Sequence, residues 1–378
     1  MQIIFIFIMK NNKNIVIYTG PAWEKWNRAS VDAGMAGSET WAAEIGAEFV
    51  KLCFDVTLFN DCPQDGEIDT NGVVYRRYEK FSQWQSVNRI KYMIFSRTCE
   101  PLTKIKINSD NIYVMVHDIC LYGNNGSDIG IQVVKKYACL SDWHIEFFMA
   151  HHNVPACQIF LTANGVREEL YGNVDHSQKK NMAVYSSSLD RGLRELLKML
   201  PAIKKEVPDF ELIVAYGFHN WELAAKMRNK PAELAHIAEV KVLLKQPGVN
   251  YVGRVDKQTL ADLQKRAKVW LYPTWFSETW AISLVEQGFA GNAIVTTPYA
   301  GMLTTGGNAP VYINGPKELP PSLWSTTPAY QENFISQSVR LLKDEKYRRE
   351  IADRVSKQTK KYTWKAAALT WLKEWGEI

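Results

Sequence analysis

The sequence predicts an α/β protein with two doubly wound domains, each built around a parallel sheet. The chain has 378 residues, which is more than one compact core usually holds, so two domains are the natural expectation. Short β-branched runs alternate with longer amphipathic segments, a pattern typical of parallel sheets in α/β units. The polar stretch GNVDHSQKK at 172–180 divides two such series and is the best candidate for a linker.

The first series predicts an amino-terminal domain over residues 10–172. A helix is expected over 38–52, with Ser38 as its N-cap and with Trp41 and Ile45 at helical spacing. The strands expected in this half are 15–18, 56–59, 73–75, 112–116 and 158–162.

The second series predicts a carboxyl-terminal domain over 181–355. A helix is expected over 193–203, ahead of the helix-breaking Pro208. The last segment, 356–378, is apolar over a wide arc and must pack against another part of the protein. Two facing domains of this kind form a cleft at the carboxyl ends of their strands, where ligands bind. The strands expected in this half are 182–185, 212–215, 269–272 and 294–296.

Composition and charge narrow the functional classes. The net charge is only +5 and the two signs are interspersed, so no clustered basic face predicts a nucleic-acid partner. A mildly basic surface suits anionic ligands such as nucleotide diphosphates. The six cysteines form no Cys-x-x-Cys pair, so neither a zinc nor a redox spacing is present. They are expected to be reduced thiols, which favours a cytoplasmic location.

The first nine residues, MQIIFIFIM, form a short apolar run. This run lacks the basic flank and the small-residue cleavage site of a signal peptide, and it is too short to span a bilayer. We expect an additional leader ahead of a start at Met9. A weak peripheral contact with a membrane surface is the alternative.

The segment 273–302 carries the residues with the clearest chemistry. A buried strand ends at Pro273, a loop then carries Glu278, and a helix expected over 281–290 carries Glu286. Free amides at a helix N-terminus attract a diphosphate, and a carboxylate accepts hydrogen bonds from sugar hydroxyls. One short segment could therefore hold a phosphate, a ribose and a sugar.

The Glu-x7-Glu spacing in this strand-loop-helix context closely resembles the donor-site motif of retaining glycosyltransferases of family four. These enzymes have the GT-B fold, in which two Rossmann-like domains face each other. The resemblance implies a nucleotide-sugar donor, with Glu286 on the ribose and Glu278 on the donor sugar. The spacing alone is common and would fit two solvated glutamates, but the flanking Pro-Thr and AGNAIVTT sequences favour a donor site.

Other segments follow the order of the family along nearly the whole chain. The run GMAGSE at 34–39, which includes Gly37, resembles the glycine loop that opens the first long helix. The pair His117-Asp118 resembles the family's His-Asp step, in which the histidine approaches the donor sugar. A structural histidine is an equal alternative there. Residues 362–364 resemble the start of the last family helix, which crosses back onto the first domain in GT-B proteins.

The segment SSSLDRGL at 186–193 departs from the commonest family pattern. Many relatives place two cations on the donor diphosphate here, whereas this chain offers Arg191 for one of them and serines for the other. The Ser-Ser-x-x-Arg-Gly variant resembles a bacterial and viral-type branch of the family. The missing cation leaves the identity of the donor open.

The resemblance implies a definite set of site residues and no metal. No Asp-x-Asp sequence follows a strand in either half, and GT-B enzymes generally stabilise the leaving diphosphate with dipoles and cations, so no metal cofactor is expected. The implied catalytic residues are His117 and Glu278, and the implied donor-binding residues are Gly37, Arg191, Thr279, Trp280, Ala281, Ile282, Ser283 and Glu286.

The expected activity is the transfer of a sugar from a nucleotide-diphosphate sugar to a glycan, a lipid or a protein-linked sugar, with retention of configuration. One alternative is a degenerate transferase that acts as a binding or partner subunit. The other is a nucleotide-sugar epimerase on the same fold. The donor base, the sugar, the acceptor and the oligomeric state follow from no pattern in the sequence.

Overall fold

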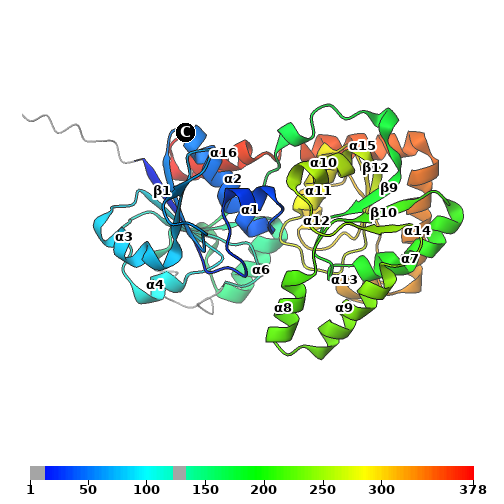
Figure 1. Ribbon diagram of the computed structural model, residues 1–378, viewed down its shortest axis with the longest axis horizontal. Helices are drawn as coiled ribbons and strands as arrows, with labels where there is room; N and C mark the ends of the chain where they lie inside the picture. Colours follow the sequence, from blue (N-terminus) through cyan, green and yellow to red (C-terminus); the bar gives the residue numbers. More distant parts are fainter. Residues whose placement is uncertain (1–12, 122–132) are drawn as a thin grey trace, which may run out of the picture.

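Two α/β domains lie side by side along the long axis of the molecule (Figure 1). The computed structural model describes residues 13–121 and 133–378, so the apolar run at 1–9 lies outside the described residues. The predicted fold of two domains with parallel sheets is confirmed. No helix in the described part of the chain combines the length and the apolar character needed to cross a bilayer.

The sheet of the first domain has the strand order β3-β4-β2-β1-β5-β6-β7-β8. All of its pairings are parallel except the one between β3 and β4 at the edge. The strands are β1 Asn14–Gly20, β2 Asp55–Asn60, β3 Glu67–Ile68, β4 Val74–Arg77, β5 Tyr92–Ser96, β6 Ile112–Met115, β7 Lys136–Cys139 and β8 Ile159–Leu161.

The sheet of the second domain has the order β11-β10-β9-β12-β13-β14 and is parallel throughout. Its strands are β9 Lys180–Tyr185, β10 Glu211–Val214, β11 Val249–Tyr251, β12 Ala267–Tyr272, β13 Ala293–Thr296 and β14 Val311–Tyr312.

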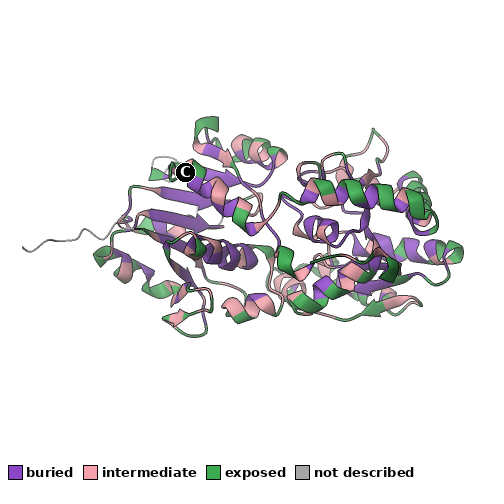
Figure 2. Ribbon diagram, turned by 90° about the horizontal axis from the view of Figure 1, so that it is seen from above, coloured by how far each residue is buried: buried purple, intermediate pink, exposed green. Residues whose placement is uncertain are grey.

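Helices cover the faces of both sheets, and Figure 2 shows the buried residues gathered in the strands and on the inner sides of the helices. The helices of the first domain are α1 Arg28–Asp32, α2 Gly37–Lys51, α3 Phe81–Val87, α4 Glu100–Lys104 and α6 Asp142–His152. Those that follow are α7 Leu193–Glu206, α8 His219–Met227, α9 Pro231–Leu243, α10 Lys257–Arg266, α11 Ile282–Phe289, α12 Met302–Gly306, α13 Pro321–Trp324, α14 Pro328–Lys343, α15 Glu345–Thr359 and α16 Trp364–Trp375.

The last helix, α16, returns to the first domain, as the resemblance implied. It packs on α2, where Trp371 lies 6.1 Å from Trp41 between ring centroids. Trp375 stacks on Tyr92 of β5 at 4.0 Å. The wide apolar arc of the last segment is therefore buried in the core of the first domain. A break separates this helix from α15, because Thr363 caps its first turn by accepting a hydrogen bond from the amide of Ala366.

Two expectations about the first domain were wrong. Strands β5 and β7 were missed, although both lie inside the sheet, β5 between β1 and β6 and β7 between β6 and β8. All residues of β5 are buried, but so are those of β6 and β13, which were predicted, so the lack of apolar-polar alternation does not by itself explain why β5 was missed. Ser38 does not cap α2, which begins at Gly37. Its hydroxyl instead donates to Glu39 and accepts from Arg97, so side chains rather than helix amides occupy it.

The two domains meet where strands end. The loop after β6 places the carbonyl of His117 2.7 Å from the Thr279 hydroxyl, which lies in the loop after β12 and donates to it. A second meeting point joins the loop before α2 to the loop before α10. Gly34 has φ +102°, and a Cβ on it would lie 2.5 Å from the carbonyl oxygen of Val255. Only glycine therefore permits this approach of the two backbones.

Candidate active site

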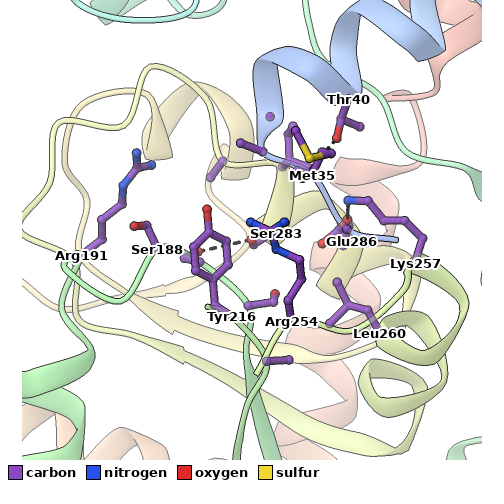
Figure 3. Close-up of a pocket in the computed structure, with 18 of the residues that line it drawn as sticks. Met35, Thr40, Ser188, Arg191, Tyr216, Arg254, Lys257, Leu260, Ser283 and Glu286 are labelled. Atoms are coloured by element: carbon purple, nitrogen blue, oxygen red, sulfur yellow. Dashed lines mark hydrogen bonds and ion pairs between the residues drawn. The ribbon is translucent and has the colours of Figure 1, made fainter. Parts of the chain in front are cut away.

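A cavity of about 200 Å³ lies between the domains at these strand ends (Figure 3). The first domain contributes residues 34–37 and Thr40 from the start of α2. The second domain contributes the loops after β9, β10, β11 and β12, together with the first turns of α10 and α11. The lining includes Glu278, Glu286, Arg191, Arg254 and Lys257, so acidic and basic groups face the same space.

The first turn of α11 presents backbone amides to this cavity. Ala281, Ile282 and Ser283 all line it. The N-cap, Ala281, has no side-chain oxygen to accept from these amides, and no side-chain cap is formed. An uncapped helix N-terminus carries partial positive charge and open donors, which suits a phosphate group.

Glu278 is buried and held by two partners. Tyr272 at the end of β12 donates its hydroxyl to Glu278 Oε1 at 2.6 Å, and Arg191 Nη1 donates to both carboxylate oxygens at 3.1 and 2.9 Å. Burial and the adjacent Glu278 carboxylate raise the pKa of Tyr272 well above its ordinary value, so Tyr272 remains a donor. A carboxylate offers about four acceptor positions, so Glu278 can still accept from a ligand hydroxyl.

Arg191 reaches Glu278 because of the glycine that follows it. Gly192 has φ +101°, and a Cβ on it would lie 2.5 Å from the carbonyl oxygen of Pro273. The start of α7 thus packs directly against the loop after β12. The guanidinium of Arg191 also stacks on the Phe276 ring at 4.0 Å. Burial alone would lower the pKa of Arg191, but the Glu278 carboxylate raises it above its ordinary value, so the group stays charged.

Glu286 lies in the second turn of α11 and is also buried. Its Oε2 accepts a hydrogen bond from Gln264 Nε2 at 3.3 Å, and its Oε1 lies 3.7 Å from Lys257 Nζ. Figure 3 shows Lys257 and Glu286 pointing toward each other at one side of the cavity. The two carboxylates of the Glu-x7-Glu spacing therefore line one cavity, each beside a cation.

The structure brings most of the predicted site residues together. Thr279 and His117 are the exceptions, because they do not line the cavity and instead contact each other across the domains. The predicted residues that line it are Gly37, Arg191, Glu278, Trp280, Ala281, Ile282, Ser283 and Glu286.

His117 is partly exposed and does not line the cavity. Its ring meets Trp41 edge-on at 5.1 Å between centroids, and its Nε2 is buried with no hydrogen-bond partner among the described residues. Burial first, and then the nearby Arg97 charge, lower the pKa of His117 well below its ordinary value. The ring is therefore neutral, and its catalytic role stays a prediction.

Among the cavity residues that sequence reasoning missed are three polar ones that argue most for a ligand, Tyr216, Arg254 and Lys257. The position of Lys257 at the start of a helix could have been predicted. Asp256 before it is the N-cap of α10 and accepts a hydrogen bond from the Thr259 amide at 2.8 Å. Tyr216 and Arg254 lie in loops after strands, where no local pattern predicts the direction of a side chain.

The family comparison agrees with this site. Residues 166–358, just over half of the chain, match the family described as glycosyl transferases group 1. The match covers the second domain and its contribution to the cavity. The chain therefore belongs to this family and is a glycosyltransferase. No curated protein sequence matches it.

Solved structures match over almost the full chain. A glycosyltransferase from Rickettsia africae ESF-5 has a TM-score of 0.70 at 10% identity, covering 97% of this chain and 98% of that one. Sucrose-phosphate synthase from Thermosynechococcus elongatus gives 0.67 at 12%, covering 97% and 98%. Anabaena HepE in complex with UDP and glucose gives 0.66 at 10%, covering 97% and 100%. At such identities these likenesses establish the fold alone, which is GT-B.

Proposed function

We propose that this protein transfers a sugar from a nucleotide-diphosphate sugar to a glycan, a lipid-linked or a protein-linked acceptor, with retention of configuration. One observation carries the proposal: a single interdomain cavity combines the open amides of α11 with the carboxylates of Glu278 and Glu286. These groups suit a diphosphate, a sugar and a ribose. Anabaena HepE, which shares the fold, was solved with UDP-glucose, and this supports a donor of that kind.

Each group takes one part of the donor. Glu286 accepts from the ribose hydroxyls, and Lys257, 3.7 Å away, helps to orient the carboxylate. The amides of residues 281–283 and the charged Arg191 hold the diphosphate. Glu278 accepts from hydroxyls of the donor sugar, with its orientation fixed by Arg191 and Tyr272.

The proposed reaction follows a same-face course. The bond between the anomeric carbon and the diphosphate oxygen breaks while the acceptor oxygen bonds to that carbon on the same face. The acceptor proton passes to a diphosphate oxygen. Negative charge grows on the leaving group, where the helix N-terminus and Arg191 stabilise it without reorganisation. We propose that these groups take the place of a metal ion.

Further parts of the proposal concern family branch and location. The serines at 186–188 line the cavity, and Ser187 donates to Ser283 in the first turn of α11 at 3.3 Å. The serine variant itself is the ground on which we assign the chain to the bacterial and viral-type branch. All six cysteines are free thiols, which supports a reducing, cytoplasmic location.

Donor hydrolysis and transfer test the proposal. Purified protein is incubated with UDP-, GDP-, ADP- and TDP-sugars, with and without excess chelator, and released nucleoside diphosphate is measured. We expect release from one donor class, undiminished by chelator. Binding without release, even with acceptor mixtures, would instead indicate a partner subunit. Release that chelator abolishes and manganese restores would contradict the metal-free mechanism.

A further inference from the structure

Among the described residues, three cationic side chains line the interdomain cavity, and they pair with different partners. Arg191 pairs with Glu278 at 2.9 Å, and Lys257 lies 3.7 Å from Glu286. In both cases the carboxylate belongs to the same domain as the cation and is buried. These two cations therefore serve first to neutralise and orient carboxylates of the site.

The third cation, Arg254, has a partner from the other domain. Its Nη1 lies 2.9 Å from Oε1 of Glu24, which follows β1 in the first domain. The two side chains remain 37% and 33% exposed, so this pair is weakly held and open to exchange. Glu24 itself does not line the cavity, whereas Arg254 does.

The position of Arg254 suits a phosphate. Figure 3 shows its guanidinium pointing into the cavity on the side of Ser283, in the first turn of α11. Its backbone neighbour Val255 is fixed by the close approach of Gly34, so the loop that carries Arg254 is held against the first domain. A guanidinium binds phosphate oxygens through two parallel hydrogen bonds, which a single carboxylate oxygen of Glu24 does not match.

We propose that Arg254 binds the diphosphate of the donor and that Glu24 competes with the diphosphate for it. This inference rests on the proposed function. Arg254 then supplies the positive charge that the serines at 186–188 do not, from a loop about 65 residues further along the chain. Because Glu24 belongs to the first domain, donor binding exchanges an interdomain ion pair for a ligand contact.

The test compares three changes by calorimetry. The probe is whichever of UDP, GDP, ADP or TDP binds the wild-type protein most tightly, together with the matching nucleoside. Arg254→Gln should weaken diphosphate binding by about tenfold or more and change nucleoside binding by less than about twofold. Arg254→Lys, which keeps the charge but not the paired donors, should fall between. Glu24→Gln should strengthen diphosphate binding by about two- to fivefold.

The control is Arg349→Gln, which breaks an exposed ion pair with Glu345 on α15, outside the cavity lining. It should change neither affinity. Diphosphate binding by Arg254→Gln within about twofold of wild type would overturn the inference while leaving the proposed function intact. Equal weakening by Glu24→Gln and Arg254→Gln would also overturn it, because the pair would then be only an interdomain bridge. If no nucleoside diphosphate binds the wild-type protein, the proposed function fails first.

Discussion

At the scale of single residues, the loop after β6 depends on two histidines with different environments. His117 sits against Trp41 and offers its carbonyl to Thr279, while His144 of α6 lies fully buried beneath the same loop. The amide of Leu140 donates to His144 Nδ1 at 3.2 Å. The neutral ring therefore carries its proton on Nε2, which donates to the Asp118 carbonyl at 3.2 Å.

We expect His117→Ala to reduce turnover at least about tenfold while changing donor affinity less than about threefold, if the ring turns toward the donor sugar in the reacting state. Turnover, donor affinity and melting temperature are measured on one preparation. The structural alternative predicts a lower melting temperature with full specific activity. That outcome would assign His117 to packing against Trp41.

His144 should make stability depend on pH. Burial lowers its pKa from 6.5 to about 4. The unfolded chain takes up a proton below its ordinary pKa while the folded protein does not, so stability falls as the pH drops from about 6.5 toward 4. Between pH 7 and pH 5, His144 alone should lower the free energy of unfolding by about 2 kcal/mol.

Urea unfolding of the wild-type protein and of His144→Gln at both pH values isolates this contribution. The glutamine side chain does not titrate, so the difference between the two pH values should be smaller in the variant. The other buried histidines are present in both proteins and cancel in the comparison. An equal pH dependence of wild type and variant would refute the assignment.

At the scale of elements, the start of α2 and the loop before α10 form a backbone contact that side chains cannot replace. Gly34→Ala adds a Cβ 2.5 Å from the Val255 carbonyl oxygen at a φ of +102°. We expect it to lower the free energy of unfolding by about 1–3 kcal/mol and to weaken donor binding, because the two loops must separate. Chemical unfolding and calorimetry measure the two effects.

Gly37→Ala is the matched control, since Gly37 belongs to the same run of residues. A Cβ there would meet only the Ile282 side chain, at an ordinary 3.4 Å. Stability should be unchanged or slightly higher, because alanine suits a helix better than glycine does. Equal losses of unfolding free energy in the two variants would show that the close approach at Gly34 has no special importance.

The helices and strands also show how much of the fold could be predicted from the sequence. The strand before Pro273 and the helix carrying Glu286 were predictable, because a buried run, a loop and a helix follow one another within one short segment. The central strand β5 was not predicted, although it is fully buried like β6 and β13, which were predicted. The helices α8 and α9 between β10 and β11 were also missed.

Contacts distant in sequence explain the remaining misses at the site. Arg254 meets Glu24 across 230 residues, and Arg191 meets Glu278 across 87. Nothing local to either cation predicts its partner. Only the packing of Gly34 on Val255 and of Gly192 on Pro273 brings these loops together. The family resemblance located Arg191, but it offered no position for Arg254.

At the scale of the whole molecule, the chain joins the domains in two ways. It passes from the first domain to the second ahead of β9 and returns before α16, where Val166 and Thr363 form a parallel bridge. Side chains also meet across the two domains, for example where the Thr304 hydroxyl donates to Asp142 Oδ2 at 3.2 Å. A ligand that binds between the domains therefore contacts both and should stabilise the whole protein.

The most direct test of the central claim, that this interdomain cavity is the nucleotide-sugar site, is calorimetric titration of the preferred nucleotide sugar into wild type, Glu286→Gln and Glu350→Gln. Glu286 lines the cavity, whereas Glu350 is an exposed residue of α15 that does not line it. We predict that Glu286→Gln weakens binding by about tenfold or more, because an ionised acceptor for the ribose is lost, while Glu350→Gln binds like wild type. Unchanged affinity in a folded Glu286→Gln protein would contradict the account.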